Sequence, residues 1–149
     1  MSTVSLHHDP GVIARASAAL RHLRERSGSL RYAAVLTDDG FTVQSTSTVQ
    51  SVHSATDTGT DAGNHDRLAS VVSSLQALGE AAVRELLDDD ASPAVLVLSD
   101  SGCIVQVRVA GAALVLAALF DGDESAGQAL ASARETALEL SPITSREAR

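Results

Sequence analysis

The chain has 149 residues, enough for one domain with a sizeable core, and 44% of them are hydrophobic although only 2% are aromatic. The formal net charge of −8 opposes binding to nucleic acid or to an anionic membrane, because both attract clustered positive charge. All eleven basic residues are Arg, a bias typical of coding in a GC-rich genome. The chain has no apolar run of the ~20 residues that a membrane span requires, and its start lacks a signal-peptide pattern. We therefore expect a cytoplasmic protein.

The first half of the chain predicts a helix followed by a hairpin. Residues 1–8 are expected to be a flexible N-terminus. Asp9 and Pro10 then form a helix start, because the Asp side chain caps free N–H groups and Pro suits the first helical turn. This helix should end at Gly28. Residues 30–36 and 41–47 are β-type runs around Asp39-Gly40, which is a strong hairpin signal.

Residues 48–64 are rich in Ser, Thr, Asp and Gly and contain few large apolar side chains. Such a composition does not bury enough surface to hold a segment in place. We expect a mobile loop here, followed by a long helix that starts at 64–66.

The helix predicted over residues 66–87 has two different faces. Apolar residues fill about half of its circumference at ~100° per residue, and we expect this half to lie on the sheet. They are Leu68, Val71, Val72, Leu75, Leu78, Ala82, Val83 and Leu86. The other half carries small side chains, which allow a second helix to come close: Ser70, Ser73, Ser74, Ala77 and Ala81. The alternative is that these small residues are simply tolerated on a solvated face.

The remaining chain predicts three strands and a last helix. The strands are residues 94–98, 104–109 and 113–120, and the third has no polar position, as in a central strand covered on both sides. Ser125 with nearby acidic residues is a cap for a helix that Pro142 terminates, and 141–149 is a tail. The fold class is therefore an α/β (α+β) sandwich of order α-β-β-α-β-β-β-α. Its single domain spans 9–140 and has a five-stranded, mostly antiparallel sheet with helices on both faces.

Catalytic and metal-binding patterns are missing from the sequence. Cys103 has no nearby His or positive charge and is interpreted as a small structural hydrophobe. The five His lack the paired spacing of a zinc site, and residues 121–124 are too short for a calcium loop. There is no phosphate-binding G-x-x-x-x-G-K-[ST] motif, and no Lys at all. We expect no enzymatic activity, no cofactor and no metal.

Three stretches resemble the Roadblock / dynein light chain family. They are the hairpin YAAVLTDDGFTVQS, the helix DRLASVVSSLQALGEAAVREL, and the run that begins AVLVLSDSGCIVQVRV and ends in the last helix. The resemblance covers roughly residues 30–140 and points to bacterial members of the actinobacterial conservon type. The 48–64 loop and the longer first helix depart from the family pattern.

This resemblance implies a profilin-like fold and a homodimer in which the middle helices pack together and the strands that follow them pair. On this chain the implied contacts are Ser70, Ser73, Ser74, Ala77, Ala81, Val95, Leu96, Val97 and Leu98. Bacterial relatives look like partners of small Ras-like GTPases, often beside a sensor kinase-like protein. Arg84 or Arg108 is the candidate side chain for contacting a GTPase, against the ordinary alternative of a surface arginine.

The leading hypothesis is thus a non-enzymatic dimeric scaffold or regulator of a small Ras-like GTPase in bacterial signalling. The alternative is a small-molecule sensor module, because profilin-like and sensor domains share similar sheets. A sensor would need an enclosed apolar pocket of ~300 Å³ or more with a few polar groups. With two Phe, one Tyr and no Trp, the chain has few side chains to line one.

Overall fold

The computed structural model describes residues 5–47, 60–90 and 92–142, with only the backbone described at 60–66. Its elements follow the predicted order after a short 3-10 turn, η1 (Leu6–His8). They are α1 (Pro10–Arg26), β1 (Leu30–Thr37), β2 (Thr42–Ser47), α2 (Thr60–Leu87), β3 (Val95–Ser99), β4 (Gly102–Arg108), β5 (Leu114–Asp121) and α3 (Ala126–Leu140). None of the described helices is long and apolar enough to cross a membrane.

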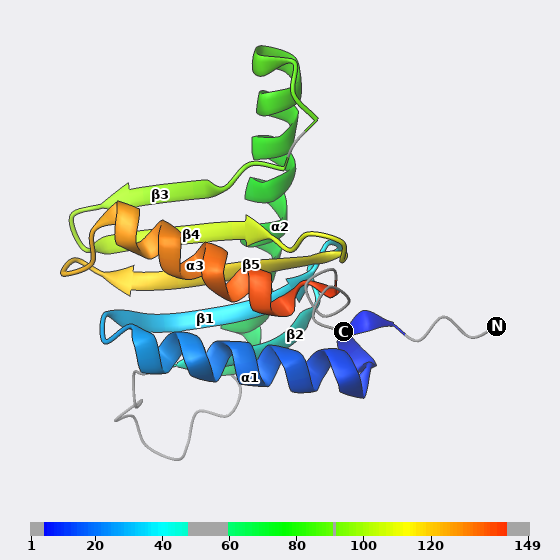
Figure 1. The fold of residues 1–149 in the computed structure, drawn as a ribbon, viewed down its shortest axis with the longest axis vertical. Helices are drawn as coiled ribbons and strands as arrows, with labels where there is room; N and C mark the ends of the chain where they lie inside the picture. The colour runs from blue at the N-terminus through cyan, green and yellow to red at the C-terminus, as the bar shows by residue number, and fades with distance from the viewer. Residues whose placement is uncertain (1–4, 48–59, 91, 143–149) are drawn as a thin grey trace.

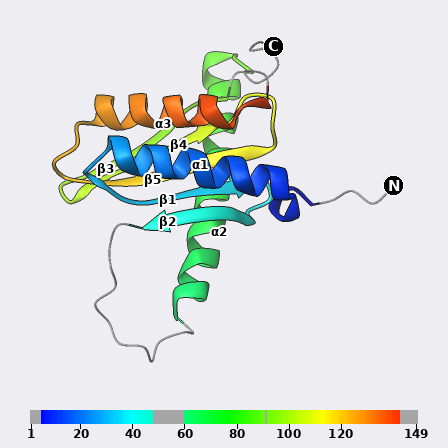
Figure 2. The same ribbon diagram turned by 60° about the horizontal axis from the view of Figure 1, so that its bottom comes forward.

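The five strands form one sheet in the order β2-β1-β5-β4-β3, and every neighbouring pair is antiparallel. Helices α1 and α3 cover one face, whereas α2 crosses the opposite face alone (Figures 1 and 2). The predicted fold class and element order are therefore confirmed. The strand without polar positions, β5, is the central strand, because a strand covered on both faces needs apolar side chains on both.

The larger core lies between the sheet and the α1/α3 layer. Its bulkiest fully buried side chains are Leu20, Leu23, Leu30, Leu116 and Phe120. The Asp9 carboxylate accepts from the N–H of Gly11 at 2.8 Å, which caps α1 as predicted, and the Ser125 hydroxyl caps α3. This layer therefore holds most of the apolar burial.

A smaller core lies on the opposite face, beneath α2. It consists of Ala34, Leu36, Ala69, Val72, Val115 and Ala117, with Tyr32 and Leu68 partly buried against it. Most of these side chains are small, so α2 gains much less apolar burial than α1 and α3 do. Contacts other than apolar packing must contribute to holding α2 on the sheet.

The predicted boundaries differ most from the structure at the N-terminus, at the start of α2 and in the C-terminal tail. Helix α2 begins at Thr60, inside the segment predicted as loop, and residues 48–59 lie outside the described part of the chain. Residues 6–8, predicted as flexible, form η1, and the His7 ring stacks on Phe41 with centroids 4.8 Å apart. Of the predicted tail, Ser141 donates from its hydroxyl to the carbonyl of Ala110 at 2.7 Å, and 143–149 lie outside the described residues.

Candidate functional site: an open apolar surface of α2 and the sheet

The side of α2 that meets the sheet is not the one predicted. Among its described side chains the buried ones are Ala69, Val72 and Gln76. Of the predicted sheet-facing residues, Val71 is 49% exposed, Leu78 67% and Leu86 81%. Ala82 is exposed as well, whereas Leu68, Leu75 and Val83 are half-buried. The prediction was right for Val72 and wrong for Val71, Leu78, Ala82 and Leu86.

Polar contacts explain why α2 is rotated away from the predicted orientation. The Gln106 side-chain amide, fully buried on β4, donates to the Val72 carbonyl at 2.9 Å. The Gln76 amide donates to the Pro93 carbonyl at 3.4 Å, and the Ser73 hydroxyl donates to the Asp38 carbonyl at 3.0 Å. A buried amide N–H group costs free energy when it has no acceptor. Gln76 of α2 therefore turns toward the sheet, Val72 lies over Gln106, and large apolar residues of α2 turn away.

Arg108, at the end of β4, joins α2 to the β1–β2 turn. Its Nε donates to Glu80 Oε1 at 2.7 Å, and one terminal nitrogen donates to Asp38 Oδ1 at 2.6 Å. Burial alone would lower the pKa of the guanidinium, but the two carboxylates raise it. The Arg108 side chain is thus held by two carboxylates of its own chain, whereas Arg84 on α2 is exposed.

The Arg108 contact also affects Glu80. Burial would raise the pKa of Glu80, but hydrogen bonds from Arg108 and Gln76 lower it below its ordinary value. A carboxyl group whose pKa is depressed by folding stabilises the folded state above its unfolded pKa, ~4.3, and this stabilisation is lost as the pH falls through the folded pKa. Glu80 should therefore contribute to acid sensitivity below about pH 5.

We expect the Glu80→Gln substitution to weaken the dependence of stability on pH between about pH 5 and pH 3. The amide keeps the shape of Glu80 but carries no charge that acid could neutralise. The urea midpoint at several pH values measures the effect, and Glu85→Gln removes one charge from the same helix as a control. An acid limb as steep in Glu80→Gln as in the parent would contradict the role of the Arg108 contact.

An apolar row on the sheet lies beside the helix. Val97, Ile104, Leu119 and Tyr32 are successive register partners across β3, β4, β5 and β1. Ile104 precedes Gln106 by two residues on β4, so its side chain points to the α2 face, as Gln106 does. Val97 and Leu119 are exposed, and Ile104 and Tyr32 are half-buried. We call these four residues the open row.

The exposed flank of α2 faces the side of the sheet that carries the open row. Ser73 and Glu80 mark the other flank, because they contact Asp38 and Arg108. Leu68 lies in the small core with Tyr32, a member of the open row. At helical spacing, Val71, Leu75, Leu78, Ala82 and Leu86 follow along the flank next to Leu68. We call these five residues the leucine flank.

The edge strand β3 is apolar on both faces. Leu98 is paired with buried Cys103 and faces the α1/α3 side, whereas Val97 faces the α2 side. Leu98 is 63% exposed and Val97 41%. The sheet order leaves β3 paired on one side only, so an edge remains where a further strand fits. A strand apolar on both faces is typical of the interior of a sheet, not of an edge.

Helix α2 continues beyond this edge. Gly79 is where α2 passes β3, since a Cβ on Gly79 would lie 3.0 Å from a methyl carbon of Val95. The C-terminal part of α2 projects past β3 in Figure 1, and it includes Leu86 and Leu87, which are both largely exposed. The leucine flank, the open row and β3 together form one apolar surface.

The structure distributes the predicted dimer residues over both flanks. Ser70, Ser74 and Ala77 are exposed, and Ala81 is half-buried. Ser73 is half-buried and bonded to Asp38, on the flank away from the open row. Val95 and Leu96 are half-buried, and Val97 and Leu98 are exposed. The role of these residues in a dimer stays a prediction, while the leucine flank is the part of α2 that had been expected to lie on the sheet.

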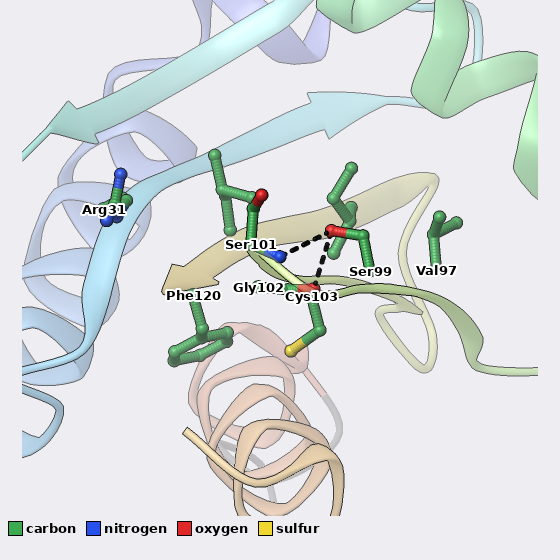
Figure 3. A pocket seen from close by; sticks show the side chains of 9 residues that line it. Arg31, Val97, Ser99, Ser101, Gly102, Cys103 and Phe120 are labelled. Atoms are coloured by element: carbon green, nitrogen blue, oxygen red, sulfur yellow. Dashed lines mark hydrogen bonds between the residues drawn. The ribbon is translucent and has the colours of Figure 1, made fainter. Parts of the chain in front are cut away.

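A small hollow lies over the open row, next to the β3–β4 turn. Its volume is about 200 Å³, and its lining includes Val97, Ile104 and Leu119 of the open row, with Cys103 and Phe120. Figure 3 shows Cys103 and Phe120 pointing toward α3, away from Val97. Burial and the nearby Glu124 raise the pKa of the Cys103 thiol, which opposes a reactive role. The hollow is open and smaller than the ~300 Å³ expected for a ligand pocket.

No cluster of three or more potential metal-ligating His, Cys, Asp or Glu occurs within the described ranges. The α2 side of the domain therefore has an apolar surface available for contact. Hydrogen bonds from Gln106 and Arg108 fix the orientation of α2. It is an α+β sandwich of profilin-like architecture with an open helix–sheet surface.

The fold is that of Roadblock/LC7 domains, as comparison with solved structures shows. The gliding protein MglB from Thermus thermophilus is 17% identical, with a TM-score of 0.72 over 93% of this chain and 94% of that one. A Roadblock/LC7 domain from Streptomyces avermitilis is 19% identical, with a TM-score of 0.64 over 80% and 89%. MglC from Myxococcus xanthus is 16% identical, with a TM-score of 0.56 over 85% and 96%. No protein-family model and no curated protein matches the chain.

Proposed function

We propose that this protein is a non-enzymatic regulator or scaffold of a small Ras-like GTPase and that it works as a homodimer. The Roadblock/LC7 fold and the sequence resemblance to bacterial members of that family support the GTPase as partner. A sensor kinase-like protein in the same system and a cytoplasmic location belong to this proposal. The net charge of −8 remains an argument against nucleic acid as partner.

The observation that carries the proposal is the apolar surface on the α2 side. Large exposed apolar areas on small domains usually mark protein contacts, and here the area combines a helix flank, the open row and a free strand edge. Val97 belongs to this surface, and Leu98 is exposed on the opposite face of the same edge strand. Both residues are among those that the family resemblance places in the dimer. One solved structure of similar fold is described as MglB with a tetrameric arrangement, so self-association occurs in that protein.

Arg84 is the better candidate of the two arginines proposed for GTPase contact. Its side chain is exposed on α2, whereas Arg108 would have to leave Glu80 and Asp38 to reach a partner. Breaking two charged hydrogen bonds costs more than is gained from one new contact of the same kind. A small-molecule sensor is less well supported, because the hollow beside Cys103 is open and its volume is only about 200 Å³.

A pull-down tests the proposed partner. The purified protein is immobilised and offered the small GTPases encoded near its gene, each loaded with GDP or with a non-hydrolysable GTP analogue. We expect one GTPase to be retained with a clear preference for one nucleotide state. Arg84→Ala should reduce the retained amount, whereas Arg24→Ala, at an exposed position of α1, should not. If no GTPase is retained in either nucleotide state, the proposed function is contradicted.

A further inference from the structure

We propose that the α1/α3 face of the domain binds an amphipathic helix of a second partner protein, one that carries large apolar side chains with an Asp or Glu beside them. The binding site is the groove between α3 and the strands β3 and β4, which we call the α3 groove. It lies on the face of the sheet opposite α2 (Figure 2), so the inference goes beyond the homodimer and the GTPase contact. The apolar lining of the groove and an arginine on its rim carry the inference.

The groove exists because α3 covers β4 but not the edge strand beside it. Cys103 on β4 is 4% exposed, whereas Leu98, its register partner on β3, is 63% exposed. Figure 1 shows that α3 crosses the strands obliquely, with its last turns farther from β3 than its first turn. A hollow of about 230 Å³ lies between these last turns and the end of β4. Its lining includes Val107, Ala110, Arg134, Ala137 and Leu138.

The floor and the wall of the groove are apolar. Val107 points to the same face as the buried Val105, two residues earlier on β4, and is half-buried beside the larger core. On the wall, Leu138 is 59% exposed. Leu130 precedes it by about 12 Å along the same flank of α3, which is room for about two turns of a second helix. An open hollow below ~300 Å³ fits side chains of a protein segment better than a whole ligand.

Arg134 gives the groove a positive charge. Arg26 and Arg108 are each held by two carboxylates, whereas the described part of the chain offers Arg134 no ion pair. Its neighbours one turn away in α3 are uncharged, and Glu135 and Glu139 both contact Arg26 on the α1 side of the helix. A carboxylate from a partner therefore complements this guanidinium, and an apolar surrounding strengthens such a pair.

Two synthetic peptides of opposite charge test the site. Both are fluorescein-labelled helices of about 14 residues with the same stripe of Leu, flanked by Glu in one peptide and by Lys in the other. By fluorescence anisotropy at physiological salt, we expect the Glu peptide to bind the full chain about tenfold more tightly than the Lys peptide. The net charge of −8 by itself favours the Lys peptide, so this preference must come from the site.

Substitutions on the rim and the wall locate the binding. Arg134→Glu should reverse the preference between the two peptides, and Leu138→Asp should weaken binding of the Glu peptide about tenfold. Both side chains are exposed in the single chain, so the fold is retained. Arg24→Glu makes the same charge change at an exposed position of α1 and should leave both affinities unchanged.

Several results would overturn the inference. They are failure of both peptides to bind, a preference of the parent chain for the Lys peptide, and equal effects of Arg24→Glu and Arg134→Glu. Tenfold tighter binding after deletion of residues 143–149 would assign the groove to the chain's own end. The proposed function is tested separately, because Leu138→Asp should still retain the GTPase in the pull-down. Loss of the GTPase in this variant would make the groove part of the GTPase contact and remove the second partner.

Discussion

Replacing Phe120 by Ala is expected to destabilise the folded protein by about 3–5 kcal/mol, the usual effect of emptying a fully buried aromatic site. Phe120 lies on the central strand β5 and contributes to the core under α1 and α3. The chain has two Phe, one Tyr and no Trp, so no second ring can fill the space. For a domain of this size the melting temperature should fall by roughly 10 °C or more.

The other phenylalanine provides the matched control. Phe41 is 51% exposed and contacts the His7 ring at the surface, so Phe41→Ala removes the same atoms with little loss of burial. We expect less than about 1 kcal/mol for it, as for most exposed positions. Both variants are compared at one protein concentration, because self-association raises apparent stability by mass action. Equal losses for Phe41→Ala and Phe120→Ala would contradict the position of the larger core.

The second large effect is expected for Leu78→Glu, which should dissociate the dimer. Leu78 lies in the apolar surface that carries the proposed homodimer, and an unpaired carboxylate buried in that contact costs several kcal/mol. The dissociation constant should therefore rise by roughly a hundredfold or more. Leu78 is exposed in the single chain, so the substitution leaves the fold of each copy intact. Sedimentation velocity over a range of concentrations measures the change.

A matched substitution separates a contact through the leucine flank from a general effect of added charge. Ala14→Glu introduces the same charge at an exposed position of α1, on the other face of the sheet, and should leave the dimer unchanged. Equal weakening of the dimer by Leu78→Glu and Ala14→Glu would contradict a contact through the leucine flank.

Local signals were sufficient for most of the fold. Asp39-Gly40 predicted the β1–β2 hairpin, and Gly40 has the positive φ of 89° that its turn requires. The unbroken apolar run in β5 predicted a central strand, and the sheet order confirmed it. The turn depends on residues adjacent in the sequence, and the central position of a strand depends on whether both of its faces are apolar. Each property can be inferred from a single segment.

The orientation of α2 could not be read in this way. Apolar residues occupy a broad arc of this helix, and periodicity alone does not say which part of the arc touches the sheet. Gln106 and Arg108 determine which side of α2 contacts the sheet. They lie on β4, far from α2 in the sequence, and donate hydrogen bonds to the Val72 carbonyl and the Glu80 carboxylate. The same limit applies to Arg108. Its partners Asp38 and Glu80 are distant in sequence, so the sequence does not show that this arginine is already bonded within the chain, and it remained a candidate for GTPase contact.

One signal for the leucine flank was present in the sequence. Val71, Leu75, Leu78 and Ala82 follow one another at spacings of four, three and four residues, a pattern typical of helices that pair with another helix. The small-residue face is a second candidate for contact with another helix. It was preferred because large apolar residues were expected to cover the chain's own sheet. The exposure of Leu78 and Leu86 removes that assumption.

If a second copy covers the α2 side of this domain, the mass of the particle in solution shows it most directly. Multi-angle light scattering behind size exclusion, at micromolar concentration, should give about twice the 15.3 kDa of one chain. A mass of 15.3 kDa at the same concentration would contradict the homodimer, because the leucine flank and the open row would then be exposed to water.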